Sequence, residues 1–219
     1  GETPEDVIPL SVRLDKDKRG LLISGPNAGG KTVAMKTMGV SMAMAMSGVF
    51  PLGTCVTNLR RLYAAIGDHQ SIDSTLSTFS SQIIRLRDIL SYCDQDALVL
   101  IDEICAGTDP AEGGALAAGI LDSLIERGAS FVVTTHQSSL KQYALSRPTI
   151  TNASLPFDEE RLQPTFNFLF GVPGNSYAFD LARNVGLPDV VLNRAKDYVG
   201  DRHGELEESI VAIQRFKLE

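Results

Sequence analysis

The sequence predicts an α/β fold in which helices flank a mostly parallel sheet, followed by a helical tail. Two observations support it: short apolar runs alternate with longer segments of helical periodicity, and a glycine-rich loop joins one such run to a helix. The 219 residues, 43% of them hydrophobic, suffice for one substantial core. We therefore expect one large domain over residues 1–187 and the tail over residues 188–219.

The first part of the chain contains two expected strands and a long helix. Residues 7–14, VIPLSVRL, have the apolar pattern of a strand, and a charged turn separates them from the buried strand expected at 21–24. The helix expected at 31–47 carries methionines at three- and four-residue steps. That spacing favours ordinary core packing over an adaptable binding stripe. The four residues are Met35, Met38, Met42 and Met46.

The middle of the chain repeats the alternation of strand and helix. A strand is expected at 61–66, and the Ser/Thr-dense stretch that follows is typical of the start of a helix, which we place at 78–92. The apolar run at 98–101 predicts the next strand, AGTDPAEGG a loop, and 115–127 the next helix. The remaining strands are expected at 131–135 and 165–170.

The tail after Pro188 is expected to be helical, with an interruption around residues 200–204. Beyond the interruption, apolar side chains recur on one helical face at Leu206, Ile210, Ile213 and Phe216. A stripe of this kind is typical of a helix that packs against a partner.

Residues 25–32, GPNAGGKT, form the complete phosphate-loop pattern G-x-x-x-x-G-K-[ST] between a predicted strand and a predicted helix. Glycines let successive backbone N–H groups turn around phosphate oxygens at a helix N-terminus, where the helix dipole favours anions. The lysine supplies a positive charge for the β- and γ-phosphates, and the threonine supplies a hydroxyl ligand for Mg²⁺. The expected nucleotide-binding residues are Gly25, Pro26, Asn27, Ala28, Gly29, Gly30, Lys31, Thr32 and Val33.

Acidic and polar side chains follow three predicted strands, at the sheet edge where the phosphate loop lies. The run LVLIDE places Asp102 to bind Mg²⁺ through water and Glu103 to activate the attacking water. His136 follows FVVTT and is placed to sense or hold the γ-phosphate, with a helix cap or a solvated imidazole as the alternative. Gln70 is favoured over its neighbour His69 for contact with the catalytic water or the Mg²⁺ shell.

Composition disfavours several classes of protein. The 27 acidic and 20 basic residues give a net charge of −7, which argues against a broad nucleic-acid groove within this chain. No stretch reaches the ~18 apolar residues of a membrane span, and no signal peptide is recognised, so a cytoplasmic location without a membrane partner is expected. Cys55, Cys93 and Cys105 have neither paired spacing nor an even count, which disfavours a zinc site or a disulfide framework.

Four segments together resemble the ATPase domain of the MutS family: GPNAGGKT, IGDHQSIDSTLSTFSSQIIRLRDIL, LVLIDEICAGTDPAEGGALA and TTHQSSL. The resemblance covers about residues 7–200. Three further segments look most like the second bacterial branch, MutS-two, with the mismatch-repair branch as the alternative. They are TDPAEG at 108–113, TNASLPFD at 151–158 and GVPGNSYAFDLARNVGLP at 171–188.

The resemblance implies an ABC-class P-loop ATPase that uses ATP and Mg²⁺ and forms a homodimer in which each nucleotide site is completed by the other subunit. Ser77, in the LSTF segment, is implied to reach the partner's γ-phosphate from a helix N-terminus, with a local helix cap as the alternative. Asn27 is similarly placed to help hold phosphate. A hydroxyl and a helix dipole stabilise a transition state less than an arginine finger, which contributes ~10³ to 10⁵-fold in rate. We therefore expect the slow turnover of a switch.

Chains of the MutS-two branch are longer, with lever and clamp regions before the ATPase domain and, in many, a nuclease domain after it. By this resemblance we expect the present chain to be an excised domain, and we expect no nuclease activity from its residues. The segment that precedes Glu2 in such chains is implied to help hold adenine. Within this chain, Val7 or Ile8 and the turn at 175–177 are the candidates for adenine contacts.

Two hypotheses of different class follow. The first is an enzyme, in which ATP hydrolysis drives a DNA-binding switch; the resemblance implies branched or distorted DNA, with recombination suppression, or collided ribosomes as the target of the whole protein. The second is a nucleotide-gated dimerisation module with negligible hydrolysis. An ABC transporter subunit is disfavoured, because no LSGGQ-like segment precedes LVLIDE, where Asp94 and Gln95 lead straight into the strand.

Overall fold

The computed structural model describes residues 8–26, 29–67, 75–158, 163–175 and 178–199, and its centre is a six-stranded sheet of order β2-β3-β4-β1-β5-β8. The first five strands in that order run parallel, and β8 pairs antiparallel with β5 at the edge. The strands are β1 Gly20–Ser24, β2 Arg61–Ala65, β3 Ala97–Ile101, β4 Ser130–Thr135, β5 Ile150–Ser154 and β8 Leu169–Phe170, and the separate pair β6 Phe157–Asp158 and β7 Gln163–Pro164.

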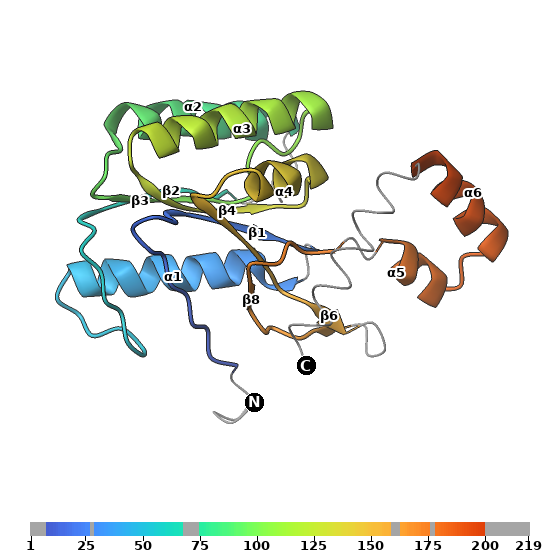
Figure 1. Ribbon diagram of the computed structural model, residues 1–219, viewed down its shortest axis with the longest axis horizontal. Coiled ribbons are helices and arrows are strands. Elements are labelled where there is room, and N and C mark those ends of the chain that lie inside the picture. The colour runs from blue at the N-terminus through green and yellow to red at the C-terminus, as the bar shows by residue number, and fades with distance from the viewer. Residues whose placement is uncertain (1–7, 27–28, 68–74, 159–162, 176–177, 200–219) are drawn as a thin grey trace.

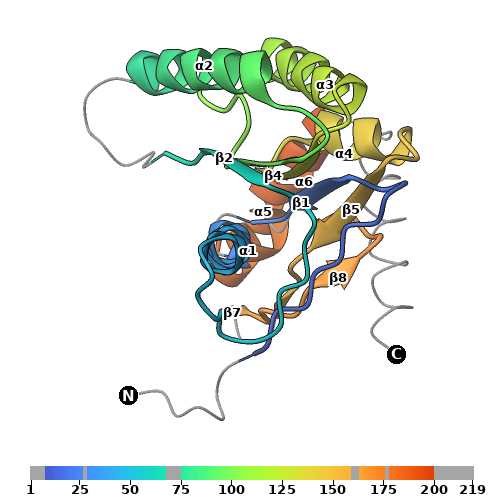
Figure 2. The same cartoon turned by 90° about the vertical axis from the view of Figure 1, so that its left-hand side faces the viewer.

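Helices cover both faces of the sheet, which confirms the predicted α/β class. Helix α1 lies on one face, and α2, α3 and α4 lie on the other (Figures 1 and 2). Helices α5 and α6 pack on each other beyond the sheet (Figure 1). The helices are α1 Lys31–Met46, α2 Thr75–Tyr92, α3 Pro110–Glu126, α4 Ser138–Leu145, α5 Ala178–Asn184 and α6 Asp189–Val199. In the part of the chain that the structure describes, no helix is long and apolar enough to cross a membrane.

The two faces of the sheet build two hydrophobic clusters. On the α1 face, Leu21 and Ile23 of β1 pack with Met35 and Met42, and on the opposite face Leu22 packs with the helices there. Because the central strands are buried on both sides, they consist of continuous apolar runs. The prediction that the methionines serve the core is confirmed for Met35 and Met42, which are 0% and 4% exposed. Met38 is partly buried against the same cluster, whereas Met46 is exposed.

The prediction of a strand at residues 7–14 is wrong for residues 8–14, the part that the structure describes. Residues 8–14 pair with no strand. Val12 and Leu14 instead lie partly buried against the cluster on the α1 face. One-sided packing of a single segment therefore produces the apolar pattern that the sequence analysis took for a strand.

Two helices begin earlier than predicted. Helix α2 begins at Thr75 rather than at 78, and α3 begins at Pro110 rather than at 115. At α3, the side chain of Asp109 accepts hydrogen bonds from two backbone N–H groups of the first turn, at 2.9 and 3.0 Å. An aspartate N-cap followed by proline is a strong helix start, so part of the expected AGTDPAEGG loop is helical.

In the later part of the chain, the strands differ from the prediction, whereas the described part of the tail is helical as predicted. Strand β5 was not expected, and the strand expected at 165–170 is limited to Leu169–Phe170. Helix α6 confirms a helical segment after Pro188. The apolar stripe expected from Leu206 onward lies outside the described residues.

A tight backbone contact joins the end of β1 to the segment that follows β8. The N–H group of Gly174 donates to Ser24 Oγ at 2.7 Å, and a Cβ at Gly174 would lie 2.4 Å from the Ser24 carbonyl oxygen. Gly174→Ala is therefore expected to lower the free energy of unfolding by ~1–3 kcal/mol, measured by urea denaturation. Gly119→Ala is the control, because no atom lies within 4 Å of its Cβ position on α3. It should be neutral or stabilising, and equal losses for both variants would contradict the contact.

Candidate functional site

A glycine-rich loop connects β1 to α1 at the carboxyl edge of the sheet. Gly25 has φ 142°, and Gly30, the N-cap of α1, has φ 87°. Side chains with a Cβ rarely adopt such angles, so glycine is required at these two positions. Gly29 N–H donates to the Pro26 carbonyl at 3.0 Å. The loop thus makes the sharp strand-to-helix turn that the sequence pattern predicts, with α1 beginning at Lys31.

Lys31 holds its ammonium group inside this loop. The residue is 2% exposed, and Nζ donates to the carbonyl oxygens of Gly25 at 2.8 Å and Pro26 at 3.0 Å. The same nitrogen lies 3.3 Å from Glu103 Oε1. A buried ammonium needs such partners because desolvation of an unpaired charge is costly. The loop therefore carries a positive charge fixed at the N-terminus of a helix, where anions bind favourably.

Asp102, 3% exposed, accepts hydrogen bonds from two threonine hydroxyls at the ends of neighbouring elements. Thr32 Oγ1 lies 3.0 and 3.1 Å from the two carboxylate oxygens. Thr134 Oγ1 of β4 donates to Asp102 Oδ1 at 2.6 Å. The site thus gathers two hydroxyl groups within hydrogen-bond distance of one carboxylate, and all three groups are hard oxygen ligands.

This donor set fits Mg²⁺. A carboxylate and a hydroxyl are oxygen ligands, and Mg²⁺ is usually held by one or two carboxylates, waters and substrate phosphates rather than by a closed protein cage. Among the residues that the structure describes, no group of three or more His, Cys, Asp or Glu side chains is placed to hold a metal. A cation at Asp102 and Thr32 would therefore take its other ligands from water and phosphate.

Glu103 lies between two basic side chains, Lys31 and His136. His136 Nδ1, just beyond β4, is 2.6 Å from Glu103 Oε2, and Lys31 approaches the other carboxylate oxygen. Burial opposes the charge of Glu103, but the hydrogen bond from His136 and the charge of Lys31 together lower its pKa below the usual range. The hydrogen bond to Glu103 correspondingly raises the pKa of His136, against a smaller opposing effect of burial. Glu103 is therefore an ionised carboxylate at neutral pH.

The matched family covers most of the chain. Residues 21–201 match the family described as MutS domain V. The chain belongs to the MutS family. The match includes the loop, Asp102, Glu103 and His136, so the geometry described above is part of the family's shared region.

Within the MutS family, the chain is similar to proteins named Endonuclease MutS2. It is 44% identical over 212 residues to the protein of that name from Clostridium botulinum (strain Loch Maree / Type A3), covering 95% of this chain and 27% of that protein. The protein from Geobacillus kaustophilus (strain HTA426) is 45% identical over 216 residues, covering 97% of this chain and 28% of that protein. The chain thus spans little more than a quarter of the length of these relatives.

The structure brings together the main residues predicted for the site of this MutS-family chain, namely Lys31, Thr32, Asp102, Glu103 and His136. Val33 is 67% exposed on α1, and Ile8 is 44% exposed. Asn175 is buried, and its Oδ1 has no hydrogen-bond partner among the described residues. The predicted residues that lie outside the described part are Val7, Asn27, Ala28, Gln70, Ser176 and Tyr177, and the side chain of Ser77.

Thr134 is the residue of the site that sequence reasoning missed. Its hydroxyl donates to Asp102 and accepts the Glu103 N–H at 2.8 Å, so one side chain orients both acids. In the sequence, Thr134 is part of the apolar run FVVTT. A threonine in a β-strand carries no functional signal by itself, because β-branched residues are common there.

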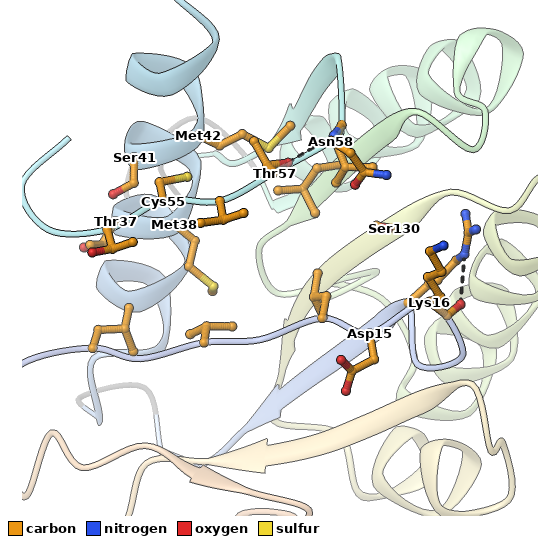
Figure 3. Close-up of a pocket in the computed structure, with 18 of the residues that line it drawn as sticks. Asp15, Lys16, Thr37, Met38, Ser41, Met42, Cys55, Thr57, Asn58 and Ser130 are labelled. Carbon is orange, nitrogen blue, oxygen red and sulfur yellow. Dashed lines mark hydrogen bonds between the residues drawn. The ribbon is translucent and has the colours of Figure 1, made fainter. Parts of the chain in front are cut away.

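A pocket of about 320 Å³ lies at the other end of the sheet (Figure 3). It is lined by residues that precede or begin strands, including Arg19 and Ser130, by Thr37 and Met38 of α1, and by the loop at 54–59. The amino ends of parallel strands lie opposite the sheet edge that carries the glycine-rich loop, and a five-residue strand spans ~17 Å. The pocket is therefore distinct from the cluster of Lys31, Asp102 and Glu103.

Proposed function

We propose that this chain is the Mg²⁺-dependent ATPase module, of the ABC-type P-loop class, of a MutS-two-like protein. The proposal rests above all on the convergence of Lys31, Thr32, Asp102 and Glu103 at one edge of the sheet. A fixed cation for the phosphates, oxygen donors for Mg²⁺ and a carboxylate beside them are the groups that phosphoryl transfer to water requires. The names of the similar proteins favour the MutS-two branch over the mismatch-repair branch.

In this proposal, Lys31 exchanges its loop carbonyls and Glu103 for oxygens of the β- and γ-phosphates. Thr32 and Asp102 would hold Mg²⁺, which when bound would neutralise charge that develops on the phosphates. Because Glu103 lies 3.3 Å from Lys31 Nζ, its carboxylate is close to the expected position of the γ-phosphate and accepts a proton from the attacking water. His136 holds Glu103 through Nδ1, so that its Nε2 is the ring nitrogen that would contact the γ-phosphate.

The same contacts support a second candidate, a nucleotide-gated dimerisation module with negligible hydrolysis. A carboxylate whose pKa is lowered by a hydrogen bond from His136 and by the charge of Lys31 is a weaker base than an ordinary glutamate. Hydrolysis should then be slow, so that ATP acts mainly by stabilising one conformation. The two candidate functions make different predictions. A slow ATPase releases phosphate in the presence of Mg²⁺ and needs Glu103 to do so, whereas a purely conformational module does not.

The whole protein, rather than this chain alone, is proposed to carry the biological activity. As the resemblance implies, Ser77 of one subunit would complete the partner's ATP site in a cytoplasmic homodimer, and closure would move attached arms. Branched or distorted DNA, or collided ribosomes, would be bound by parts of the longer proteins that this chain does not span. The net charge of −7 supports this division. We propose no nuclease role for these residues.

Asp102→Asn tests the proposed enzyme. We expect Mg²⁺-dependent phosphate release to fall by ~100-fold, because the amide removes the negative charge and its NH₂ group opposes the hydroxyls of Thr32 and Thr134. Phosphate release is measured against Mg²⁺ concentration, and ATP binding by titration calorimetry. Asp17→Asn, an exposed carboxylate before β1, is the control. If the unaltered chain binds ATP but releases no phosphate with Mg²⁺, the dimerisation module is the better description.

A further inference from the structure

The turn that carries Glu103 has an unusual backbone. Glu103 has φ 46° and Cys105 has φ 51°, both in the left-handed region that residues with a Cβ rarely adopt. Such conformations cost free energy and persist only where the surrounding structure determines them from several sides. The orientation of Glu103 therefore depends on the groups that hold this turn.

Backbone N–H groups of the turn have partners in three other parts of the chain and within the turn itself. Thr134 receives two of these hydrogen bonds, on its hydroxyl and on its carbonyl oxygen. The backbone bonds are Asp102 N to Ala65 O at 3.1 Å, Ile104 N to Thr134 O at 3.2 Å and Ala106 N to Glu103 O at 3.1 Å. The Cys105 N–H, next to the second left-handed position, is satisfied by a side chain rather than by the backbone.

That side chain is Gln82 of α2. Its Oε1 accepts the Cys105 N–H at 2.8 Å, and its Nε2 donates to the Asp102 carbonyl at 2.9 Å. One amide group thus bonds the backbone on both sides of Glu103. Both hydrogen bonds are partly buried, where loss of a partner leaves a desolvated polar group and costs more than at the surface.

We propose that Gln82 is a positioning residue for the ATP hydrolysis proposed above, on which this inference rests. Its amide holds the turn at 102–105 so that the Glu103 carboxylate stays between Lys31 and His136. Gln82 and Ser77 both belong to α2. The helix that is implied to complete the partner's site is therefore also hydrogen-bonded to the turn that carries Glu103.

Gln82 is not needed to dock α2 on the sheet. Leu86 and Ile89 are 2% and 5% exposed in the hydrophobic cluster on that face, and Ile83 packs against the same cluster. These apolar contacts anchor the helix without the amide. Removal of the amide is therefore expected to change the turn rather than the packing of the helix.

Gln82→Met is the decisive variant, because it keeps the length of the side chain and removes both hydrogen bonds. We expect kcat for ATP to fall by about tenfold, because loss of both hydrogen bonds leaves Glu103 less firmly oriented, while Kd for Mg²⁺-ATP stays within about twofold. Exchange of the Cys105 amide hydrogen, followed by mass spectrometry or NMR, should accelerate by about tenfold or more. Gln142→Met, at an exposed glutamine of α4, is the matched control.

Unchanged kcat in Gln82→Met would overturn the inference, and so would a parallel loss of ATP binding, which indicates a general structural effect. Gln82→Leu repeats the test with a different apolar shape, and the two variants should agree. If the unaltered chain hydrolyses no ATP, the proposed function fails instead. Exchange at Cys105 then still decides whether Gln82 holds the turn.

Discussion

Glu103→Gln is expected to slow ATP hydrolysis by at least about 100-fold while ATP still binds. The amide keeps the size of the side chain but accepts no proton from water. It also carries no negative charge to hold the Lys31 ammonium, which lies 3.3 Å from Glu103 Oε1. Since Lys31 then loses a competing partner, we expect ATP to bind more tightly to the variant. Phosphate release gives the rate, and titration calorimetry gives the affinity.

Glu126→Gln is the control for this substitution, because Glu126 is exposed at the end of α3. Equal phosphate release by the unaltered chain and Glu103→Gln would contradict the enzymatic role of Glu103. The slow variant also serves to examine the proposed dimer by sedimentation, because blocked hydrolysis should trap a closed state with Mg²⁺-ATP. Addition of Ser77→Arg should abolish that dimer, and a monomer under saturating ATP would contradict the role given to Ser77.

The part of the site that the sequence predicts well is governed by local rules. Gly25 and Gly30 have positive φ angles, which glycine adopts readily. The sequence pattern of the loop is therefore recognisable by glycines at fixed positions. Strands β3 and β4 are buried on both faces, so their apolar runs are visible, and the polar residues that follow them mark the carboxyl edge of the sheet. Asp102, Glu103 and His136 are found for this reason.

Other elements depend on distant partners and were missed. Strand β5 lies in the parallel sheet beside β1, yet its sequence ITNAS has three polar residues, of which Asn152 and Ser154 are only 4% and 0% exposed. Burial of polar side chains in a strand leaves no hydrophobic pattern to detect. Conversely, Val12 and Leu14 show a strand-like pattern without a partner strand. The sequence of a single segment can indicate which side chains are buried, but it does not show which strand, if any, the segment pairs with.

The orientation of Glu103 could not be predicted from the sequence, because it also depends on partners that are distant along the chain. Its left-handed backbone is held by Thr134, 31 positions away, and the following Cys105 by Gln82, 23 positions away. Both partners lie within segments that resemble the MutS family, but nothing in the sequence assigns either of them a role in orienting Glu103. The residue types of the candidate site are therefore predictable from spacing, whereas the groups that orient Glu103 require the folded chain.

Lys31→Met is expected to weaken binding of ATP by about 10- to 100-fold, the effect of losing hydrogen bonds to a charged donor. Methionine keeps an apolar stem of similar length in the buried position, which is 2% exposed. The loop glycines and their backbone N–H groups remain, so part of the phosphate site is retained. Titration calorimetry with ATP, ADP and AMP measures the effect, and Lys36→Met, at an exposed lysine of the same helix, is the control.

The three nucleotides separate a specific effect of Lys31 from a general one. The proposed contacts of Lys31 are to the β- and γ-phosphates, so AMP binding should change little, while ATP and ADP lose affinity. Removal of Lys31 also removes one of the charges that lower the pKa of Glu103, so that pKa should rise in the variant. Equal losses for AMP and ATP would instead indicate a distorted loop, and would contradict the assignment of the Lys31 charge to the terminal phosphates.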